Sequence, residues 1–219
     1  MENIQTIKLS FVNAFLIKTG EQFILTDTGL SLHRDLLVKE LEAAGCLPGK
    51  LALIILTHGD FDHTGNSSFL RQMYGCRVAI HEADLPMVRD GKRPARKMKG
   101  IRTRVFAVIR KLLKRKFTFE KMAPDLFLTD GQNLLEFGLE AKIIHIPGHT
   151  AGSIGILTSG GALIAGDTFL NRGRPGTATL VENEDDLRNS YSRLRSQSIK
   201  MIYPGHGRPF SIDKISGKF

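Results

Sequence analysis

The sequence of 219 residues predicts an α/β fold, a four-layer αββα sandwich in which two mixed β-sheets lie between outer helices. Three observations support this prediction. The chain forms two loosely similar series, each with strands, a helix, and a strand that runs into a histidine-bearing turn. A content of 42% hydrophobic residues is enough for a substantial core. No Pro-, Gly- or Ser-rich linker divides the chain, so we expect a single domain over residues 1–219.

The first series begins with short apolar runs, which are typical of strands, and continues with apolar residues at helical spacing. Gly45 is expected to end the first helix. A continuous apolar run at 51–56 has the length of a strand buried on both faces. The predicted order is strands 7–12, 14–17 and 22–25, helix 32–44, strand 51–56, helix 66–74 and strand 77–80.

The second series follows a basic segment and has the same character. Its strands are short and apolar, and its helix is polar. We predict strands at 134–137, 140–146, 153–157 and 162–165, a helix at 182–196, and a last strand at 199–203.

The stretch directly after the predicted strand at 51–56 holds the closest grouping of potential metal ligands in the chain. His58, Asp60, Asp62 and His63 place four potential metal ligands within six positions. Imidazoles and carboxylates gathered this closely repel one another unless a cation or a proton compensates their charges. The spacing His-x-Asp-x-Asp-His therefore predicts a metal-binding loop.

Three further motifs lie at or near predicted strand ends: Pro147-Gly148-His149, Gly166-Asp167-Thr168 and Pro204-Gly205-His206. Gly or Pro beside each candidate ligand lets the backbone turn sharply and approach a metal. Taken with the first motif, they indicate a two-metal site.

These four motifs, in this order, resemble those of the metallo-β-lactamase-fold superfamily, whose members are αββα metallohydrolases. The resemblance covers nearly the whole chain, from residues 13–16 and 25–29 to His206. It is closest to the branch that includes glyoxalase II-like and lactonase-like members. It implies a dinuclear metal-dependent hydrolase, in which a hydroxide shared by two metals cleaves an ester, thioester or lactone-type bond of a small-molecule substrate.

The resemblance also implies a role for each candidate residue. Asp62 would in addition act in catalysis, by accepting a proton from the nucleophile, and Asp27 would support the ligands without binding metal. The implied ligands are His58, Asp60 and His149 at the first metal position, Asp62, His63 and His206 at the second, and Asp167 as the carboxylate that bridges the two.

One position departs from the usual pattern, because Asp60 stands where the family commonly has histidine. Zinc is the expected metal. A third carboxylate, however, is a harder ligand and favours iron or manganese more than an all-nitrogen set would. It also leaves less positive charge at the site to acidify a bound water. Two alternatives therefore stay open: a di-iron redox enzyme, and a non-catalytic metal-binding protein that keeps the fold.

Residues 86–121 hold 14 Lys and Arg against 2 Asp and Glu, so this segment carries more positive charge than the net +9 of the whole chain. We expect a helical cap insert here, with apolar residues at helical spacing from Ile101 to Leu113. Its positive face could attract an anionic substrate or contact an anionic membrane surface. Nucleic acid is not expected as a partner, because few aromatic residues are available for stacking.

The remaining histidines and cysteines are expected to be structural or exposed. We expect His33 to face solvent, His81 to lie outside the ligand set, and His145 to be packed or hydrogen-bonded. Cys46 and Cys76 form no Cys-x-x-Cys pair and are expected to be buried as small apolar residues. With no secretory signal visible at the N-terminus, a reducing cytoplasmic location is predicted.

Overall fold

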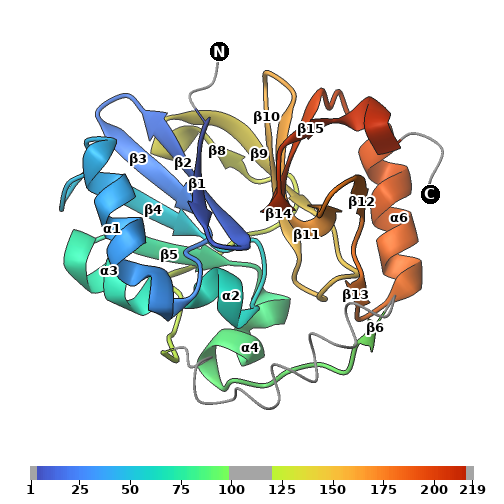
Figure 1. Ribbon diagram of the computed structural model, residues 1–219, viewed down its shortest axis with the longest axis horizontal. Helices are drawn as coiled ribbons and strands as arrows, with labels where there is room; N and C mark the ends of the chain where they lie inside the picture. Colours follow the sequence, from blue (N-terminus) through green and yellow to red (C-terminus); the bar gives the residue numbers. More distant parts are fainter. Residues whose placement is uncertain (1–3, 99–119, 216–219) are drawn as a thin grey trace.

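The computed structural model describes residues 4–98 and 120–215, and it has two mixed β-sheets stacked between helices (Figure 1). The predicted αββα architecture is confirmed. In Figure 1, α1 and α3 cover the outer face of one sheet and α6 covers the outer face of the other. The expected cap helix falls mostly on residues 99–119, outside the described part of the chain.

The first sheet has the strand order β1-β2-β3-β4-β5-β7. Its first two pairings are antiparallel and the following three are parallel. The strands are β1 (Ile4–Leu9), β2 (Val12–Thr19), β3 (Gln22–Thr26), β4 (Leu51–Ile55), β5 (Arg77–Ile80) and β7 (Leu126–Phe127). The helices of this half are α1 (Arg34–Ala43), α2 (Phe61–Thr64), α3 (Ser67–Tyr74) and α4 (Leu85–Arg89), with 3₁₀ turns at Ser31–His33 and Glu82–Asp84.

The second sheet has the order β15-β14-β11-β10-β9-β8, and β12 pairs with β11. Only the β11–β14 pairing is parallel among these. Its strands are β8 (Asn133–Leu134), β9 (Leu139–His145), β10 (Ile154–Thr158), β11 (Ala162–Asn171), β12 (Pro175–Thr177), β14 (Met201–Gly207) and β15 (Phe210–Ser211), and its helices are α6 (Glu184–Arg195) and 3₁₀ turns at Leu135–Phe137 and Ile212–Ile215. A separate two-stranded ribbon pairs β6 (Lys97–Met98) with β13 (Leu180–Val181).

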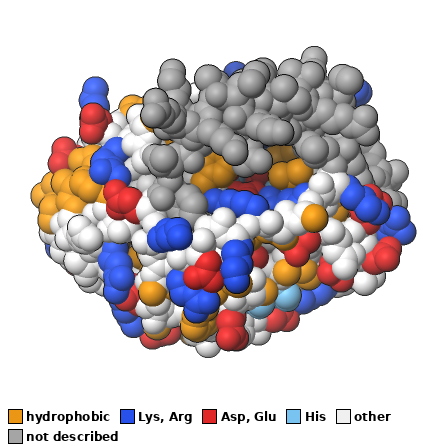
Figure 2. Space-filling view, turned by 90° about the horizontal axis from the view of Figure 1, so that it is seen from below, with side chains coloured by type: hydrophobic (Ala, Val, Ile, Leu, Met, Phe, Trp, Pro, Cys, Tyr) orange, Lys and Arg blue, Asp and Glu red, His pale blue; other side chains and the backbone are white. Residues whose placement is uncertain are grey.

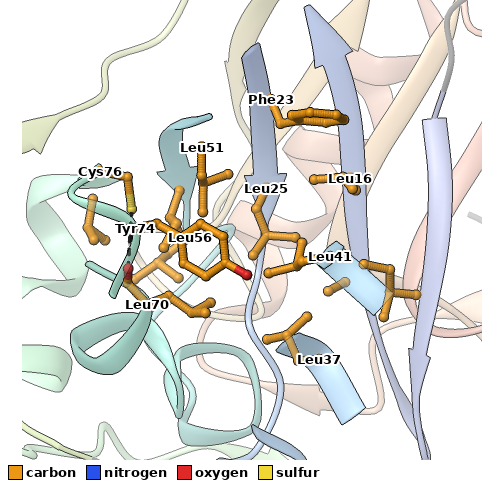
Figure 3. Close-up of a cluster of buried hydrophobic side chains, with 14 of the residues drawn as sticks. Leu16, Phe23, Leu25, Leu37, Leu41, Leu51, Leu56, Leu70, Tyr74 and Cys76 are labelled. Atoms are coloured by element: carbon orange, nitrogen blue, oxygen red, sulfur yellow. Dashed lines mark hydrogen bonds between the residues drawn. The ribbon is translucent and has the colours of Figure 1, made fainter. Parts of the chain in front are cut away.

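Three buried apolar clusters fill the three spaces between the four layers. Neighbouring residues of one strand serve different clusters: Phe15 points between the sheets, whereas Leu16 packs toward the first pair of helices. This alternation is the two-residue period of a strand. Figure 3 shows the cluster of the first half, where Leu37 and Leu41 of α1 meet the sheet and Tyr74 of α3.

Both cysteines lie in this first cluster, so their predicted burial is confirmed. The Cys76 thiol contacts the Leu70 carbonyl at 3.8 Å, as the dashed line in Figure 3 marks. Burial raises the pKa of the Cys76 thiol to about 11 and that of Cys46 to about 12. Both thiols are therefore protonated at neutral pH and behave as apolar side chains.

The structure corrects several predicted boundaries. Residues 134–137 form a strand only at Leu134 and continue as a 3₁₀ turn, since Gly138 takes a left-handed conformation (φ 73°) that ends the turn. Strands β11 and β14 extend to Asn171 and Gly207, well beyond the predicted ends. The extensions include glycine, proline and polar residues of low strand propensity, and the pairing of the two strands with each other outweighs this local preference.

Candidate metal centre

The structure brings all seven predicted ligand residues together where the ends of β4 and β9 meet the edge formed by β11 and β14. Their ligand atoms form three overlapping groups, and within each group the atoms lie within 4.8 Å of one another. The groups are His58, Asp60 and His149; His58, His63 and Asp167; and Asp62, His63 and His206. Because His58 and His63 each belong to two groups, the three groups form one continuous cluster.

The first sheet supplies four of these residues from one short segment. The loop after β4 carries His58 and Asp60, and Asp60 precedes the single turn of α2. That turn holds Asp62 and His63. The sequence therefore folds its most ligand-rich stretch into a strand end, a loop and a helical turn, and their four side chains meet in one cluster.

The second sheet supplies the other three. His149 lies in the loop between β9 and β10, whereas Asp167 and His206 lie inside β11 and β14. Asp167 follows a register shift of the β11–β14 pair, and Gly166 there has φ +49°. A side chain at Gly166 would lie 2.5 Å from the Thr57 hydroxyl, so only glycine lets the two sheets approach this closely.

A fully buried carboxylate, Asp27, orients two of the histidines. Its Oδ2 accepts hydrogen bonds from Nδ1 of His63 and from Oγ1 of Thr57, each at 2.8 Å. Its Oδ1 accepts from the Thr57 amide at 2.8 Å. Since the Thr57 hydroxyl proton points to Asp27, its oxygen accepts from Nδ1 of His58 at 3.0 Å. Both imidazoles therefore carry a proton on Nδ1 and present Nε2 to the cluster.

The other two histidines are fixed in the same tautomer by backbone carbonyls. His149 donates from Nδ1 to Leu180 O at 2.7 Å, and His206 donates from Nδ1 to Phe11 O at 2.6 Å. A carbonyl oxygen can only accept, so Nδ1 bears the proton in each case. All four imidazoles consequently turn Nε2 toward the carboxylates of the cluster.

Several of the inward-facing atoms have no hydrogen-bond partner within residues 4–98 and 120–215. They are Nε2 of His58, Nε2 of His63 and Oδ1 of Asp167, and all three are buried. An unsatisfied buried polar atom costs about 1–3 kcal/mol, so a set of three in one place needs an explanation. The donor set, imidazole nitrogen with carboxylate oxygen, fits a divalent cation such as zinc, iron or manganese.

Protonation takes the place of a cation in the protein without metal. Burial lowers the pKa of a histidine, but the charges of Asp27 and Asp167 outweigh burial and raise the pKa of His63 well above its usual value. Burial likewise acts to raise the pKa of Asp167, yet the charges of His206 and His63 hold it well below its usual range. The cluster is thus built to hold positive charge among ionised carboxylates.

Two arginines that the sequence pattern did not indicate, Arg93 and Arg96, lie next to Asp60. Arg96 donates from Nη1 to Oδ2 of Asp60 at 2.6 Å, and its side chain is only 6% exposed. Arg93 donates from Nη1 to the Gly59 carbonyl at 2.7 Å. Both belong to the basic segment but precede its helical apolar pattern, and the proline between them was the one sign that this stretch is not helix.

A third residue that the sequence did not indicate is Asp84, which is buried at the end of a 3₁₀ turn after β5. Its carboxylate accepts hydrogen bonds from the Gly59 amide at 2.7 Å, from the Gly152 amide at 2.8 Å and from the Thr150 hydroxyl at 2.8 Å. Asp84 therefore ties the loop of His58 to the loop of His149. Nothing in the sequence pattern around Asp84 distinguishes it from an exposed helix-capping residue.

The rim of the cluster combines an aromatic and a cationic side. Phe11 is 37% exposed, and its ring stacks on His206 with centroids 5.7 Å apart. On the other side Arg93 has 28% of its side chain exposed and lies over the Phe61 ring. Figure 2 views the molecule from below, the side on which α2, α4 and β6 lie, and it shows Lys and Arg side chains gathered in the middle of this face.

The three remaining histidines stay outside the ligand groups. His145 stacks on His81 with ring centroids 4.1 Å apart, and its Nε2 is 2.9 Å from the Ala151 carbonyl. This arrangement confirms the prediction that His145 is packed and hydrogen-bonded. His33 is half-buried, in a 3₁₀ turn, so the expectation that it faces solvent is only partly correct. In the described residues no helix is both long and apolar enough to cross a membrane.

Comparison with known proteins identifies the relatives of this chain. The family model described as "Metallo-beta-lactamase superfamily" matches residues 7–206. A protein of Methanocaldococcus jannaschii called "Probable metallo-hydrolase" is 31% identical over 199 residues, covering 89% of this chain and 87% of its own. Some relatives are longer: the chain covers 52% of a lactamase-like protein from Pestalotiopsis microspora, at 25% identity over 94% of this chain.

Solved structures share the fold. A metallo-beta-lactamase family protein from Thermus thermophilus has a TM-score of 0.72 at 24% identity, covering 96% of this chain and 74% of its own. A protein solved in a di-iron-bound form has a TM-score of 0.71 at 23% identity, covering 98% and 96%.

Proposed function

Because the chain belongs to the metallo-beta-lactamase superfamily, we propose that it is a hydrolase that holds two divalent metal ions and cleaves an ester, thioester or lactone-type bond. The observation that carries the proposal is the convergence, from both sheets, of buried Nε2 and Oδ1 atoms that have no hydrogen-bond partner among the described residues. The name of the archaeal relative, a probable metallo-hydrolase, supports the same reaction class.

The side chains divide into two metal positions. His58, Asp60 and His149 would hold the first ion, and Asp62, His63 and His206 would hold the second. Asp167 lies 3.4 Å from Nε2 of His63 and 3.2 Å from Nε2 of His206, and its Oδ2 lies 3.9 Å from Nε2 of His149, so one carboxylate can serve both positions. Two divalent ions bound there would lower the pKa of water and polarise the bond to be cut.

Each remaining group has a role of its own. The Asp62 side chain is 15% exposed, which leaves it able to accept a proton from the attacking water. Asp27, Leu180 O and Phe11 O keep the imidazoles in the tautomer that ligation needs. The exposed edge of Phe11 offers an apolar wall, and Arg93 offers a positive charge, so a small substrate with an acyl part and an anionic group suits the rim.

The test is a substrate panel with defined metal content. Protein stripped with a chelator and reloaded with zinc, manganese or iron is assayed against a thioester, a lactone, an aryl ester and a β-lactam. We expect the wild type to turn over the thioester, the lactone or the aryl ester. His63→Ala should lose turnover and about one bound ion. The matched control His81→Ala should lose neither. Equal metal content in His63→Ala and the wild type would refute the assignment.

A redox function is the second candidate, and the specific observation in its favour is the third carboxylate, Asp60, within 4.8 Å of His58 and His149. Oxygen ligands favour iron more than an all-nitrogen set does. Elemental analysis of protein expressed without added zinc separates the two functions. Colourless protein that contains zinc and hydrolyses the panel supports the hydrolase, whereas iron-containing protein that consumes oxygen supports the alternative.

The partners and the location stay predictions. A small-molecule substrate, no nucleic-acid partner and a cytoplasmic location are expected from the sequence. An anionic substrate and contact with a membrane surface are the two alternatives for the basic segment. The main helical pattern of that segment lies outside the described residues.

A further inference from the structure

Arg96 introduces a buried positive charge next to the one ligand position at which this chain departs from its family. Oδ2 of Asp60 is 2.6 Å from Nη1 of Arg96, 3.1 Å from Nε2 of His149 and 3.5 Å from Nε2 of His58. The oxygen that faces the two imidazoles is therefore the same oxygen that accepts from the guanidinium. A cation at the first position and Arg96 must share it.

The backbone around Arg96 is fixed, so this contact is part of the fold. The next residue, Lys97, begins β6, which pairs with β13 through Val181 and Leu180. Leu180 is the residue whose carbonyl orients His149. The second guanidinium nitrogen, Nη2, lies 3.8 Å from the sulfur of Met87 in α4. Arg96 is thus held between α4 and the ribbon, with its charge directed at Asp60.

The charges of the cluster show what this contact achieves. Two divalent ions with the three carboxylates Asp60, Asp62 and Asp167 retain one net positive charge. Arg96, the guanidinium that donates a hydrogen bond to Asp60, adds one. Counted with Arg96, the set has the same net charge as two divalent ions with two carboxylates and a neutral histidine at position 60. Arg93 lies farther away, with Nη1 4.0 Å from Oδ1 of Asp60, and donates its hydrogen bond to the Gly59 carbonyl. Since buried charges interact strongly through a medium of low permittivity, a difference of one charge matters here.

We propose that Asp60 and Arg96 act as one unit that replaces a neutral histidine ligand, with Arg96 as the positioning residue that restrains how strongly the first position binds a cation. This inference rests on the proposed two-metal site. It corrects the expectation that Asp60 simply leaves the site less positive, because the compensating charge comes from Arg96. It also makes the two positions unequal, since only the first shares a ligand atom with a guanidinium.

Four variants test the unit. Arg96→Met, Asp60→His and the double variant are compared with Arg89→Met, which removes an arginine of the same segment that pairs with Asp90 rather than with the cluster. Affinities for zinc are measured by competition with a chromophoric chelator, and ion stoichiometry by elemental analysis. Thermal unfolding of the chelator-treated proteins provides a readout that needs no metal.

The charge argument fixes the direction of each change. Arg96→Met removes a repelling charge, so the weaker of the two ions should bind at least about tenfold more tightly. Asp60→His leaves Arg96 facing a cation without its carboxylate, so the same ion should bind at least about tenfold more weakly. The double variant and Arg89→Met should stay within about threefold of the wild type. If Arg96→Met weakens zinc binding or leaves it unchanged, Arg96 only orients Asp60 and the proposal is wrong.

Unfolding without metal gives an independent decision. Arg96→Met removes the shortest contact of the Asp60 carboxylate, and Asp60→His takes the carboxylate away from the buried Arg96 guanidinium. Each single variant should therefore lower the unfolding temperature by at least about 5 °C, whereas the double variant should recover at least half of that loss. Additive losses would overturn the pairing. If wild-type protein binds no divalent ion at all, the proposed function fails, and this cycle still decides whether Asp60 and Arg96 form a unit.

Discussion

Asp27→Asn should convert two of the candidate ligand histidines, His58 and His63, into the wrong tautomer while leaving the shape of the core almost unchanged. In the wild type, Oδ2 of Asp27 accepts from Nδ1 of His63 and from Oγ1 of Thr57, both at 2.8 Å. Oδ1 must still accept from the Thr57 amide, so the amide nitrogen of asparagine would occupy the Oδ2 position. That nitrogen is a donor, and it would face two groups that are also donors.

The conflict is relieved only if protons move. His63 would lose the proton from Nδ1 and carry it on Nε2, which faces Asp167 and the second metal position. The Thr57 hydroxyl would turn to accept from asparagine and donate to Nδ1 of His58, which moves that proton to Nε2 as well. Loss of a carboxylate that orients a ligand histidine typically lowers metal affinity by about 10–100-fold, and here one substitution affects both positions.

Zinc competition and long-range ¹H–¹⁵N NMR of the imidazoles measure the effect. We expect both ions to bind about 10–100-fold more weakly, which is about 1.4–2.7 kcal/mol each, with the His63 and His58 protons on Nε2 in the chelated protein. The matched control is Asp125→Asn, in which the carboxylate accepts from the Val78 amide at 2.8 Å, away from the cluster. Wild-type affinity in Asp27→Asn, with Nδ1 of His63 still protonated, would refute the reasoning.

Three further changes probe other parts of the centre. Asp84→Ala removes the acceptor of three buried hydrogen bonds from the loops of His58 and His149. It should lower the free energy of unfolding by about 2–4 kcal/mol, measured in urea on chelated protein. A loss below about 1 kcal/mol would show that Asp84 does not stabilise these loops. Because the pKa of His63 is raised in the folded state, its protonation stabilises the fold fully below pH 6.5, and this stabilisation is lost as the pH rises through the raised pKa. Chelated protein should therefore melt at a lower temperature at pH 9 than at pH 6. Equal melting temperatures would contradict this reasoning. Gly205→Ala places a methyl group against Oδ1 of Asp167 and should reduce the bound metal, whereas Gly176→Ala meets open space and should leave it unchanged.

Half of the His and Asp cluster could be identified from the sequence because its residues are local. His58, Asp60, Asp62 and His63 follow an apolar strand within six residues, and both the strand and the cluster are visible in the order of residue types. The layered fold was predictable for a similar reason, since the short apolar runs of both sheets are local patterns.

The contacts of Asp84 and Arg96 with the cluster could not be predicted, because they join segments that are distant in the sequence. Asp84 acts through amides 25 and 68 positions away, and Arg96 meets Asp60 across 36 positions. A carboxylate or a guanidinium in a polar stretch has the same appearance in sequence whether it faces solvent or a buried partner. The resemblance to a family implied the candidate ligands that are distant in the sequence, His149, Asp167 and His206. A family pattern does not indicate which residue offsets the negative charge of an atypical residue such as Asp60.

The positions of the ligands along the chain connect metal supply to the lifetime of the protein. Ions held between His58 and His206 would fasten segments of both sheets that are far apart in sequence, and they would do so only in the folded state. At an ion concentration about 100 times the dissociation constant, one such ion adds about 2.7 kcal/mol to the free energy of unfolding. Starvation for the ion would therefore increase the unfolded fraction that proteases degrade, so the abundance of this protein in a cell should follow the available metal.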